Sequence, residues 1–294
     1  MLSILIPCYN FNAVPLVKEL YKQAENLQII FEIICIDDAS KSTLNLHNNS
    51  INLLEHATFH EIENNIGRSA MRNLLASKAK YHNLLFLDVD VFPKDANFIK
   101  RYLTSKDSSV IYGGLECSIQ KPETTNALRW KYTLKRECIP YKKRLLNPFL
   151  NFSSACFFIK KEIFNLIKFD ETLKQYGWED VLFAHHLQQH NTPITHIENP
   201  VLHNNIETSV VYLQKTNHAI KNLSSLLRNN KVPYSLYRIS KLHAQINKLH
   251  ITPFLNVVFN LTKKNIKRNL LSQNPNLLLF DFYKLGLLSS LTKN

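Results

Sequence analysis

The stretch LLFLDVDVF, residues 84–92, places Asp88 and Asp90 inside an otherwise apolar run that ends at Pro93. An apolar run of this length, bounded by a proline, is typical of a buried strand in a parallel sheet. Unpaired carboxylates are costly to bury, so we expect both acids at the carboxyl end of the strand. There both can reach one divalent cation, because Mg²⁺ and Mn²⁺ prefer oxygen ligands. Solvated acids in a turn are the alternative.

The residues before this run alternate between two patterns. Residues 2–9 and 31–37 are apolar runs with strand character, whereas residues 13–27 and 67–79 have apolar residues at helical spacing. Repeated strand–helix–strand units predict an α/β fold, with a mainly parallel sheet between helices. Ligands of such sheets bind beyond the carboxyl ends of the strands. The polar clusters PCYN, DDAS and DVD follow three of these strands and predict a site at that rim.

The rest of the chain is less regular at first and then helical. Residues 112–164 contain several prolines with basic and aromatic residues, and we expect this long excursion to cover the site. Residues 176–190 have helical spacing and begin with a glycine and two acids. A short strand that ends at His203 follows, and the pattern is mostly helical from about residue 209 onward.

Composition and charge narrow the location and the partners. The 294 residues include five cysteines without paired spacing, which argues against a disulfide framework and favours a reducing compartment. No run approaches the roughly 18 apolar residues of a membrane span, and no leader pattern opens the chain, so we expect a cytoplasmic protein. The net charge is +13, and residues 215–294 hold 13 Lys and Arg against one acid, Asp281. This cationic end predicts contact with an anionic surface.

Five motifs occur along the chain in a fixed order: SILIPCYN, IICIDDAS, NNIGRSAMRN, LLFLDVDVF and GWEDVLF. In this order and at these separations they resemble the bacterial, inverting family 2 glycosyltransferases of the GT-A fold, over roughly residues 1–215. The resemblance implies a Rossmann-like GT-A glycosyltransferase domain at residues 1–214, with residues 112–164 on its acceptor side. Residues 215–294 would form a helical, cationic C-terminal extension.

The resemblance also implies a donor site. The residues that would bind the nucleotide sugar are Pro7, Tyr9, Asn10, Asp37, Asp38, Asn64, Arg68, Arg72 and Asp88. Asp38 would accept a hydrogen bond from the base, which suits N3–H of uracil and therefore a UDP-linked sugar. Asp88, Asp90 and His203 would hold Mn²⁺ or Mg²⁺. A hydrogen-bonded histidine at a strand end is the alternative for His203.

The same resemblance implies an inverting reaction. The nucleotide diphosphate leaves the anomeric carbon with growing negative charge, which a divalent cation neutralises. On the opposite face, one carboxylate of Glu179 and Asp180 takes the proton of the acceptor hydroxyl, and we expect Asp180 to be this general base. One displacement from the back would then transfer a hexosyl or N-acetylhexosaminyl group with inversion.

Aromatic, basic and amide side chains near the excursion suit a saccharide or lipid-linked glycan acceptor. These acceptor-side candidates are Trp130, Arg136, Asn151 and Trp178. A solvated lid is the alternative for residues 112–164, and a core position is the alternative for Trp178.

In residues 247–272 and 274–291, apolar residues at helical spacing lie near several lysines and an arginine, which predicts an amphipathic, cationic surface. Such a surface suits the anionic headgroups on the inner face of a plasma membrane, where the protein would be peripheral. Packing on the transferase domain and a homodimer interface are the alternatives. The charge comes without a recognition motif, so we expect no nucleic acid partner.

Two other functions use some of the same residues. Phosphohydrolases of the haloacid dehalogenase type carry Asp-x-Asp after an apolar strand, but normally on their first strand, whereas the motif is the fourth element here. A catalytically inactive GT-A domain that binds a membrane or a polyanion is the second alternative. Intact Asp88, Asp90 and Asp180 argue against it, because a site without activity gains nothing from costly acids.

Overall fold

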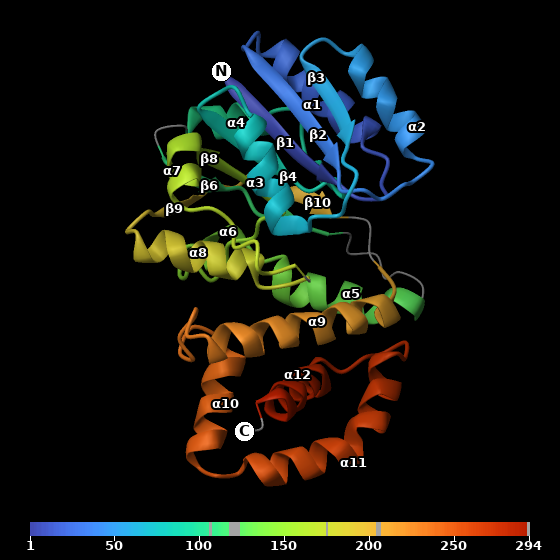
Figure 1. The fold of residues 1–294 in the computed structure, drawn as a ribbon, viewed down its shortest axis with the longest axis vertical. Helices are drawn as coiled ribbons and strands as arrows, with labels where there is room; N and C mark the ends of the chain where they lie inside the picture. The colour runs from blue at the N-terminus through green and yellow to red at the C-terminus, as the bar shows by residue number, and fades with distance from the viewer. Residues whose placement is uncertain (106–107, 118–123, 175, 204–206, 293–294) are drawn as a thin grey trace. The chain divides into compact units, whose positions relative to one another are not determined.

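The computed structural model describes residues 1–105, 108–117, 124–174, 176–203 and 207–292. The chain divides into two compact units, drawn together in Figure 1. Unit 1 consists of Met1–Ser118, Cys138–Lys174 and Glu179–Asn205, and unit 2 consists of Ile119–Glu137, Gln175–Trp178 and Ile206–Asn294. The limits at residues 214 and 215 that the resemblance implies stay a prediction.

Unit 1 is built on a seven-stranded sheet with the strand order β3-β2-β1-β4-β8-β6-β9. The strands are β1 (Leu2–Cys8), β2 (Phe31–Asp37), β3 (Ala57–Glu61), β4 (Asn83–Leu87), β6 (Val110–Tyr112), β8 (Cys156–Lys160) and β9 (Ile194–His196). β1 pairs in parallel with β2 and β4, β2 with β3, and β6 with β9, whereas β8 runs antiparallel to β4 and β6. The expected α/β fold with a mainly parallel sheet is confirmed.

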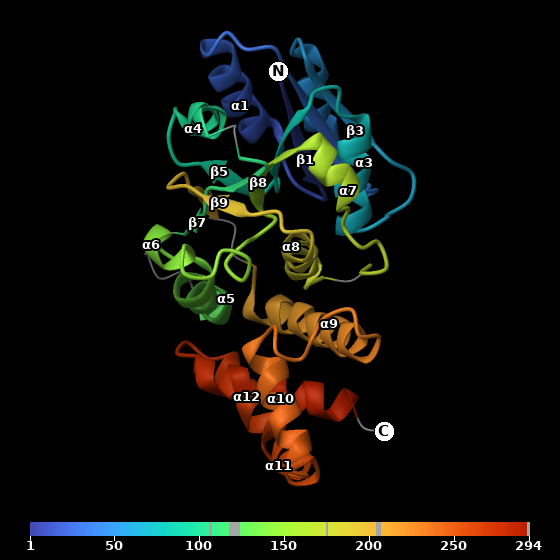
Figure 2. The same cartoon turned by 90° about the vertical axis from the view of Figure 1, so that its left-hand side faces the viewer.

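Alternate residues of these strands enter two hydrophobic clusters, one on each face of the sheet. Ile4 and Ile6 pack in one cluster with α1 (Val14–Asn26) and α4 (Phe98–Thr104). Leu5 packs in the other, together with residues of α3 (Arg68–Lys78), α7 (Lys161–Leu166) and α8 (Glu179–Gln189). Figure 2 shows α1 and α4 on one side of the sheet and α3 and α7 on the other. Because both faces are covered, apolar residues are favoured at nearly every position of the strands, and in β1 and β4 all residues but Ser3 and Asn83 are apolar.

A second, three-stranded sheet has the order β5-β10-β7. Its strands are β5 (Val91–Pro93), β7 (Leu115–Glu116) and β10 (Val201–His203). β5 and β10 are antiparallel, and their register places His203 opposite Val91. The last residue of β10 therefore lies beside the turn that connects β4 to β5. In unit 1, the link from β2 to β3 also contains α2 (Asn45–Asn48) and a 3₁₀ helix (Asn49–Leu53).

Arg144, in α6 (Tyr141–Arg144), forms hydrogen bonds that hold the segment before β8 against the edge of the main sheet. Its Nη2 donates to Gly113 O at 2.9 Å and to Ile197 O at 3.0 Å, and its Nη1 donates to Nδ1 of His196 at 3.1 Å. Burial, opposed by a hydrogen bond to Pro148 O and reinforced by the guanidinium charge, lowers the pKa of His196 to about 4. His196 is therefore neutral at pH 7, when it donates from Nε2 to Pro148 O at 3.0 Å.

Unit 2 is helical in the part that the structure describes. It contains a 3₁₀ turn (Thr124–Asn126), α5 (Ala127–Tyr132), a π-helical turn (Thr133–Glu137), α9 (Ser209–Arg228), α10 (Arg238–Lys248), α11 (Thr252–Leu270) and α12 (Leu277–Leu291). Its core joins Leu128 of α5 to Tyr212 of α9, Phe259 of α11 and Tyr283 of α12. Figure 1 shows α12 within a frame formed by α9, α10 and α11.

α12 is thus the central helix of unit 2, and the amphipathic surface expected for residues 274–291 is wrong for most of this helix. Its mid-helix Gly286 permits close packing, because a Cβ there would lie 2.3 Å from the ring of Phe259. The helix begins at an Asn276 cap, whose Oδ1 accepts from Leu278 N at 2.8 Å. Among the described helices, none has the length and hydropathy that crossing a bilayer would require.

Candidate active site

The turn between β4 and β5 carries the two aspartates. Asp88 directly follows β4, and its backbone N–H donates to Ala155 O at 2.8 Å. The backbone N–H of Val91 donates to Asp88 O at 3.3 Å and closes the turn. β4 is buried, whereas both aspartates are half-buried. The apolar strand therefore delivers both carboxylates to the carboxyl edge of the sheet.

Asp88 forms an ion pair with Arg72 of α3. The Arg72 side chain is 1% exposed, and its guanidinium carbon lies 5.4 Å from the ring centre of Phe169. Burial raises the pKa of Asp88, and the charges of Arg72 and Arg68 oppose that rise. Arg72 pairs with Asp88 from the buried side of the rim. Because the Arg72 side chain is buried, it exposes little surface for the base or diphosphate contact that the resemblance implies.

Asp90 lies beside His203. The register of β5 and β10 pairs His203 with Val91, the residue after Asp90, and the Oδ2 atom of Asp90 lies 3.3 Å from Nε2 of His203. Burial raises the pKa of Asp90, but the hydrogen bond and charge of His203, the charge of Arg68 and a backbone hydrogen bond together leave that pKa below its ordinary value. Nδ1 of His203 is buried and has no hydrogen-bond partner among the described residues. The pair offers one carboxylate and one imidazole at the same point of the rim.

Arg68, at the start of α3, links this turn to the first turn of α8. Its Nη1 lies 3.4 Å from Oε1 of Glu179, which is buried. Its positive charge also acts against the effect of burial on the pKa of Asp88 and of Asp90. The side chain of Arg68 is itself 46% exposed. Three acids and a half-exposed cation therefore gather at one place, although they come from distant parts of the chain.

Asp180 follows Glu179 in the first turn of α8, where the helix N-terminus favours negative charge. Its Oδ1 accepts a hydrogen bond from Val181 N at 2.8 Å. Burial is the main cause that raises the pKa of Tyr112 on β6, and the negative charge of Asp180 contributes to that rise. The two neighbouring acids thus have different surroundings: Glu179 pairs with Arg68, whereas Asp180 acts on Tyr112.

Asp37 and Asp38, at the end of β2, hold the backbone of the rim. Asp37 accepts hydrogen bonds from the backbone N and the Oγ of Ser40, at 2.7 and 2.8 Å. Asp38 accepts from Ile66 N at 2.7 Å and from Gly67 N at 2.9 Å. Both aspartates are buried, so their carboxylates shape the loops that precede the helices. A direct bond from Asp38 to a nucleotide base stays a prediction.

The loop that Asp38 holds leads into α3 through Gly67. Gly67 is the N-cap residue of α3 and has φ of +85°, a conformation that other residues rarely adopt. A Cβ at this position would also lie 3.3 Å from Lys174 O. Glycine is therefore needed to set the start of α3 and with it the position of Arg68.

The remaining donor candidates lie along the same rim. Tyr9, just after β1, is 60% exposed and offers a ring face to a ligand. Asn10 follows with φ of +49°, in the left-handed region that asparagine tolerates. Pro7 is half-buried in β1, and Asn64 is exposed in the loop before α3.

The described residues contain no cluster of three or more His, Cys, Asp or Glu side chains arranged to hold a metal ion. Asp90 and His203 nevertheless fit a divalent cation, because they present an oxygen and a nitrogen donor together and the imidazole is held by β10. A cation with two protein ligands takes its other ligands from water or a phosphate, which is common for Mg²⁺. Asp88 is oriented by Arg72, and its place in a metal shell stays a prediction.

The acceptor-side candidates fall in both units. In unit 1, Nδ2 of Asn151 donates to Arg144 O at 3.4 Å. In unit 2, Arg136 forms an ion pair with Asp281 at 3.0 Å, and the Trp178 ring meets that of Tyr237 edge-on at 4.8 Å. Trp130 belongs to α5 in unit 2. These contacts give Asn151, Arg136 and Trp178 structural partners, and acceptor binding by all four residues stays a prediction.

Three residues of this site were not singled out from the sequence. Ser40 follows Asp37 by three positions, a spacing typical of a turn closed by a side chain. The motif DDAS could therefore have predicted the hydrogen bond between them. Asn65, whose Nδ2 donates to Asp38 O at 2.8 Å, lies next to Asn64 in the same motif. Phe169, which packs against the Arg72 guanidinium, follows 97 positions after it in the numbering and carries no local signal.

Comparison with known proteins identifies the matched region. Residues 3–167, more than half of the chain, match the family model described as "Glycosyl transferase family 2". No curated protein sequence matches the chain. The matched residues include the rim of β1 and β2, α3, and the aspartate turn, whereas His203 and the acids of α8 lie beyond them.

Solved structures are similar to the chain at low sequence identity. The crystal structure of S. aureus TarS 1-349 aligns with a TM-score of 0.49 and 17% identity, covering 99% of this chain and 89% of that one. GalNAc-T7, crystallised with UDP, GalNAc and Mn²⁺, aligns with a TM-score of 0.50 and 18% identity, covering 70% of this chain and 43% of that one. The second likeness supports the fold of the aligned part.

Proposed function

The chain belongs to glycosyl transferase family 2, and we propose that it transfers a hexosyl or N-acetylhexosaminyl group from UDP to a hydroxyl group of a saccharide or lipid-linked acceptor. The observation that carries this proposal is the acidic turn at the carboxyl edge of the sheet, inside the matched region. Asp88 and Asp90 form this turn, and Arg68 joins it to Glu179 of α8. A donor and an acceptor would meet between these two acidic groups.

On the donor side, the rim offers one exposed ring and one half-exposed cation. Tyr9 would contact the base, while Arg68 would contact a phosphate oxygen of the diphosphate. Arg72 holds Asp88 from below, which leaves the second oxygen of Asp88 available to accept from a ribose hydroxyl. GalNAc-T7 was crystallised with UDP and Mn²⁺, which makes these two ligands the first to test.

Asp90 and His203 would hold the divalent cation, Mn²⁺ or Mg²⁺. A cation bound there supplies positive charge that stabilises the diphosphate leaving group. Asp90 and His203 would supply the two metal-binding atoms, Oδ2 and Nε2, which the structure holds 3.3 Å apart. A neutral imidazole nitrogen of His203 would bind such a cation through its lone pair.

On the acceptor side, we assign the general base to Asp180. Its carboxylate would take the proton of the attacking hydroxyl as that oxygen bonds to the anomeric carbon. The bond from the anomeric carbon to the diphosphate oxygen breaks at the same time, and its electron pair leaves with UDP. Attack opposite the leaving group inverts the configuration. Glu179, paired with Arg68, would orient the first turn of α8.

Calorimetry with UDP tests the donor site. Wild-type protein should bind UDP in the presence of MnCl₂ and lose at least about tenfold in affinity when EDTA replaces the metal. Asp90→Asn should bind UDP weakly under both conditions, because it has lost a charged ligand. Glu25→Gln is the matched control, since Glu25 is exposed near the end of α1, at the opposite edge of the sheet.

Two results would contradict the proposal. UDP binding that is equally tight with and without Mn²⁺ would exclude the role of the cation in holding the donor. Release of inorganic phosphate from a phosphomonoester, without consumption of any nucleotide sugar, would instead favour the phosphohydrolase alternative.

A further inference from the structure

α10 and α11 of unit 2 carry a ridge of exposed apolar side chains. The α10–α11 ridge consists of Leu242, Leu249, Ile251, Phe254, Val257 and Leu261. Three of them, on α11, are 68%, 57% and 76% exposed, in the order Phe254, Val257 and Leu261. Their spacing of three and four residues places them on one face of the helix.

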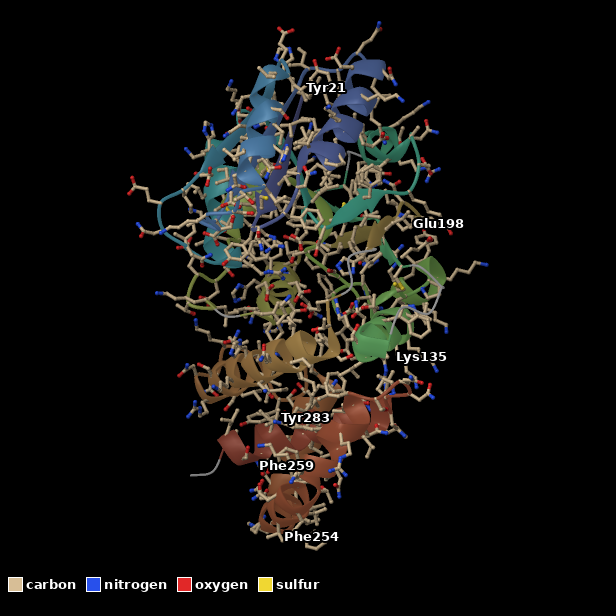
Figure 3. The ribbon with its side chains drawn as sticks, turned by 90° about the vertical axis from the view of Figure 1, so that its right-hand side faces the viewer. Tyr21, Lys135, Glu198, Phe254, Phe259 and Tyr283 are labelled. Atoms are coloured by element: carbon tan, nitrogen blue, oxygen red, sulfur yellow. The ribbon has the colours of Figure 1, made fainter. Side chains whose placement is uncertain are left out.

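The opposite face of α11 already supplies the core of unit 2. Leu255, Phe259, Ile266 and Leu270 are buried there, and the ring of Phe259 lies 5.9 Å from that of Tyr283. Figure 3 shows Phe254 at the edge of unit 2, while Phe259 and Tyr283 lie within it. The core of unit 2 is therefore complete without the ridge residues, which face solvent. Water-exposed apolar side chains in a contiguous row are typical of a binding surface.

Basic residues continue the same face of α11. Lys264 follows Leu261 by three residues and Arg268 follows Lys264 by four, and both are exposed, as is Lys267 beside them. Lys248 is exposed at the end of α10, between Leu242 and Leu249 of the ridge. Cationic side chains thus lie within the span of the ridge and beyond its last residue, Leu261.

Negative charge is scarce in this part of the sequence. Residues 215–294 contain one acid, Asp281, against 13 Lys and Arg. The Asp281 carboxylate pairs with Arg136 at 3.0 Å and with Lys284 at 2.9 Å. The cations beside the ridge therefore have little negative charge near them in the sequence, and the surface is complementary to an anionic partner.

We propose that the α10–α11 ridge docks on a bilayer that contains anionic phospholipid. The apolar side chains would enter the boundary between headgroups and acyl chains, and the lysines and arginine would contact the headgroup phosphates. None of the described helices spans a bilayer, so the contact is interfacial. This inference does not rest on the sugar-transfer activity, because docking needs neither a donor nor an acceptor.

The chemistry of the ridge favours lipid over the other partners. In a symmetric dimer the same patch would meet itself, which would bring the cations of Lys248, Lys264 and Arg268 against like charges. A nucleic acid offers phosphates, but the aliphatic side chains of Val257 and Leu261 cannot stack on bases as aromatic rings do. An anionic bilayer offers negative charge and an apolar layer together.

Sedimentation with vesicles tests the proposal on the full chain. Vesicles of phosphatidylcholine mixed with phosphatidylglycerol should bind the protein, and vesicles of phosphatidylcholine alone should bind it at least about tenfold less. The variant Phe254→Ser/Val257→Ser/Leu261→Ser should lose at least about tenfold in binding to the anionic vesicles. Lys264→Gln/Arg268→Gln should lose a similar factor, and raised salt should weaken wild-type binding.

Matched controls come from unit 1. Leu46→Ser/Leu53→Ser removes two apolar side chains that are 77% and 86% exposed, and Lys18→Gln/Lys22→Gln removes two exposed cations of α1. Both controls should bind anionic vesicles as the wild type does. Circular dichroism and the melting temperature establish that each variant is folded. If the triple serine variant were unfolded, the Lys264→Gln/Arg268→Gln variant would decide, since it changes two exposed polar positions.

Three outcomes would overturn the inference. The first is equal binding to both kinds of vesicle, and the second is an equal loss of binding in the unit 1 controls. The third is a wild-type dimer, detected by analytical ultracentrifugation, that the triple serine variant abolishes while neither protein binds vesicles. That result would assign the ridge to a second copy of the chain.

Discussion

The guanidinium of Arg72 is buried under the sheet's carboxyl edge and forms an ion pair with Asp88, the first carboxylate of the turn after β4. Two elements separated in sequence are joined by this pair, since Arg72 comes from α3 and Asp88 follows β4. The buried charge of Arg72 explains in part why an apolar run can contain aspartates, because it compensates the charge of Asp88. Asp88 is oriented before any ligand binds, whereas Asp90 points to His203.

Loss of the Arg72 charge should destabilise the fold. Arg72→Met leaves Asp88 largely buried without its cation, so we expect the free energy of unfolding in urea to fall by about 3–5 kcal/mol. Arg101→Met is the control, because its ion pair with Asp95 is exposed and should contribute about 1 kcal/mol or less. The double variant Arg72→Met/Asp88→Asn should recover part of the loss. Additive losses in the double variant would show that the two side chains do not stabilise each other.

Removal of the Asp180 charge should separate binding from transfer. Asp180→Asn keeps the size of the side chain but cannot accept the acceptor's proton, so we expect the transfer rate to fall by about 10²–10⁴-fold. UDP affinity measured by calorimetry should stay within about twofold of wild type. Glu179→Gln breaks the pair with Arg68 and should change donor affinity as well. A wild-type transfer rate in Asp180→Asn would exclude this residue as the base.

His196 should make the stability of unit 1 depend on pH. Its pKa is about 4 in the folded protein, whereas an unfolded histidine has a pKa of about 6.5. Below about pH 6.5 the unfolded chain takes up a proton that the folded imidazole does not, so stability is full above that pH and falls as the pH drops toward 4. From pH 7 to pH 5 this group alone should cost about 2 kcal/mol.

Urea unfolding at pH 7 and pH 5 measures this effect. In His196→Gln the drop between the two pH values should be smaller than in wild type by that amount. His60→Gln, which changes an exposed residue of β3, should keep the wild-type drop. Equal drops in wild type and His196→Gln would show that the buried imidazole is not responsible.

Close packing of α12 on α11 should make Gly286 intolerant of a methyl group. In Gly286→Ala the new Cβ meets the Phe259 ring, and we expect unfolding to become easier by about 1–3 kcal/mol, with a lower melting temperature in calorimetry. Ser290→Ala is the control on the same helix, because Ser290 is exposed. The double variant Gly286→Ala/Phe259→Leu should recover part of the loss. An unchanged melting temperature in Gly286→Ala would mean that the two helices can move apart at little cost.

Local patterns were sufficient to predict most of unit 1. β1, β2 and β4 are mainly apolar because helices cover both faces of the sheet, and such runs are visible without any knowledge of the fold. The position of Asp88 and Asp90 after a strand follows from the same pattern. The predicted helix at residues 176–190 begins later in the structure, where α8 starts at Glu179.

Contacts between distant residues could not be predicted in this way. From the sequence, an arginine in a motif at the rim is interpreted as a residue that binds the donor. The burial of Arg72 against Asp88 depends on the angle at which α3 packs on the sheet, which the sequence does not reveal. In residues 274–291, apolar residues at helical spacing suggested a surface helix, although apolar residues occur around most of the circumference of α12. Their partners come from α5, α9 and α11, which no local pattern identifies.

Unit 2 is assembled from three separate stretches of the chain, and this has a consequence for its biosynthesis. Leu128 of α5 belongs to the same core as Phe280 and Tyr283 of α12, the last helix of the chain. Ribosomes add about 5–20 residues per second, so α5 is made on the order of ten seconds before α12. The strands of unit 1 are complete once His203 has been translated, whereas the core of unit 2 can close only after synthesis of the final helix. During that interval Leu128 lacks its packing partners from α12.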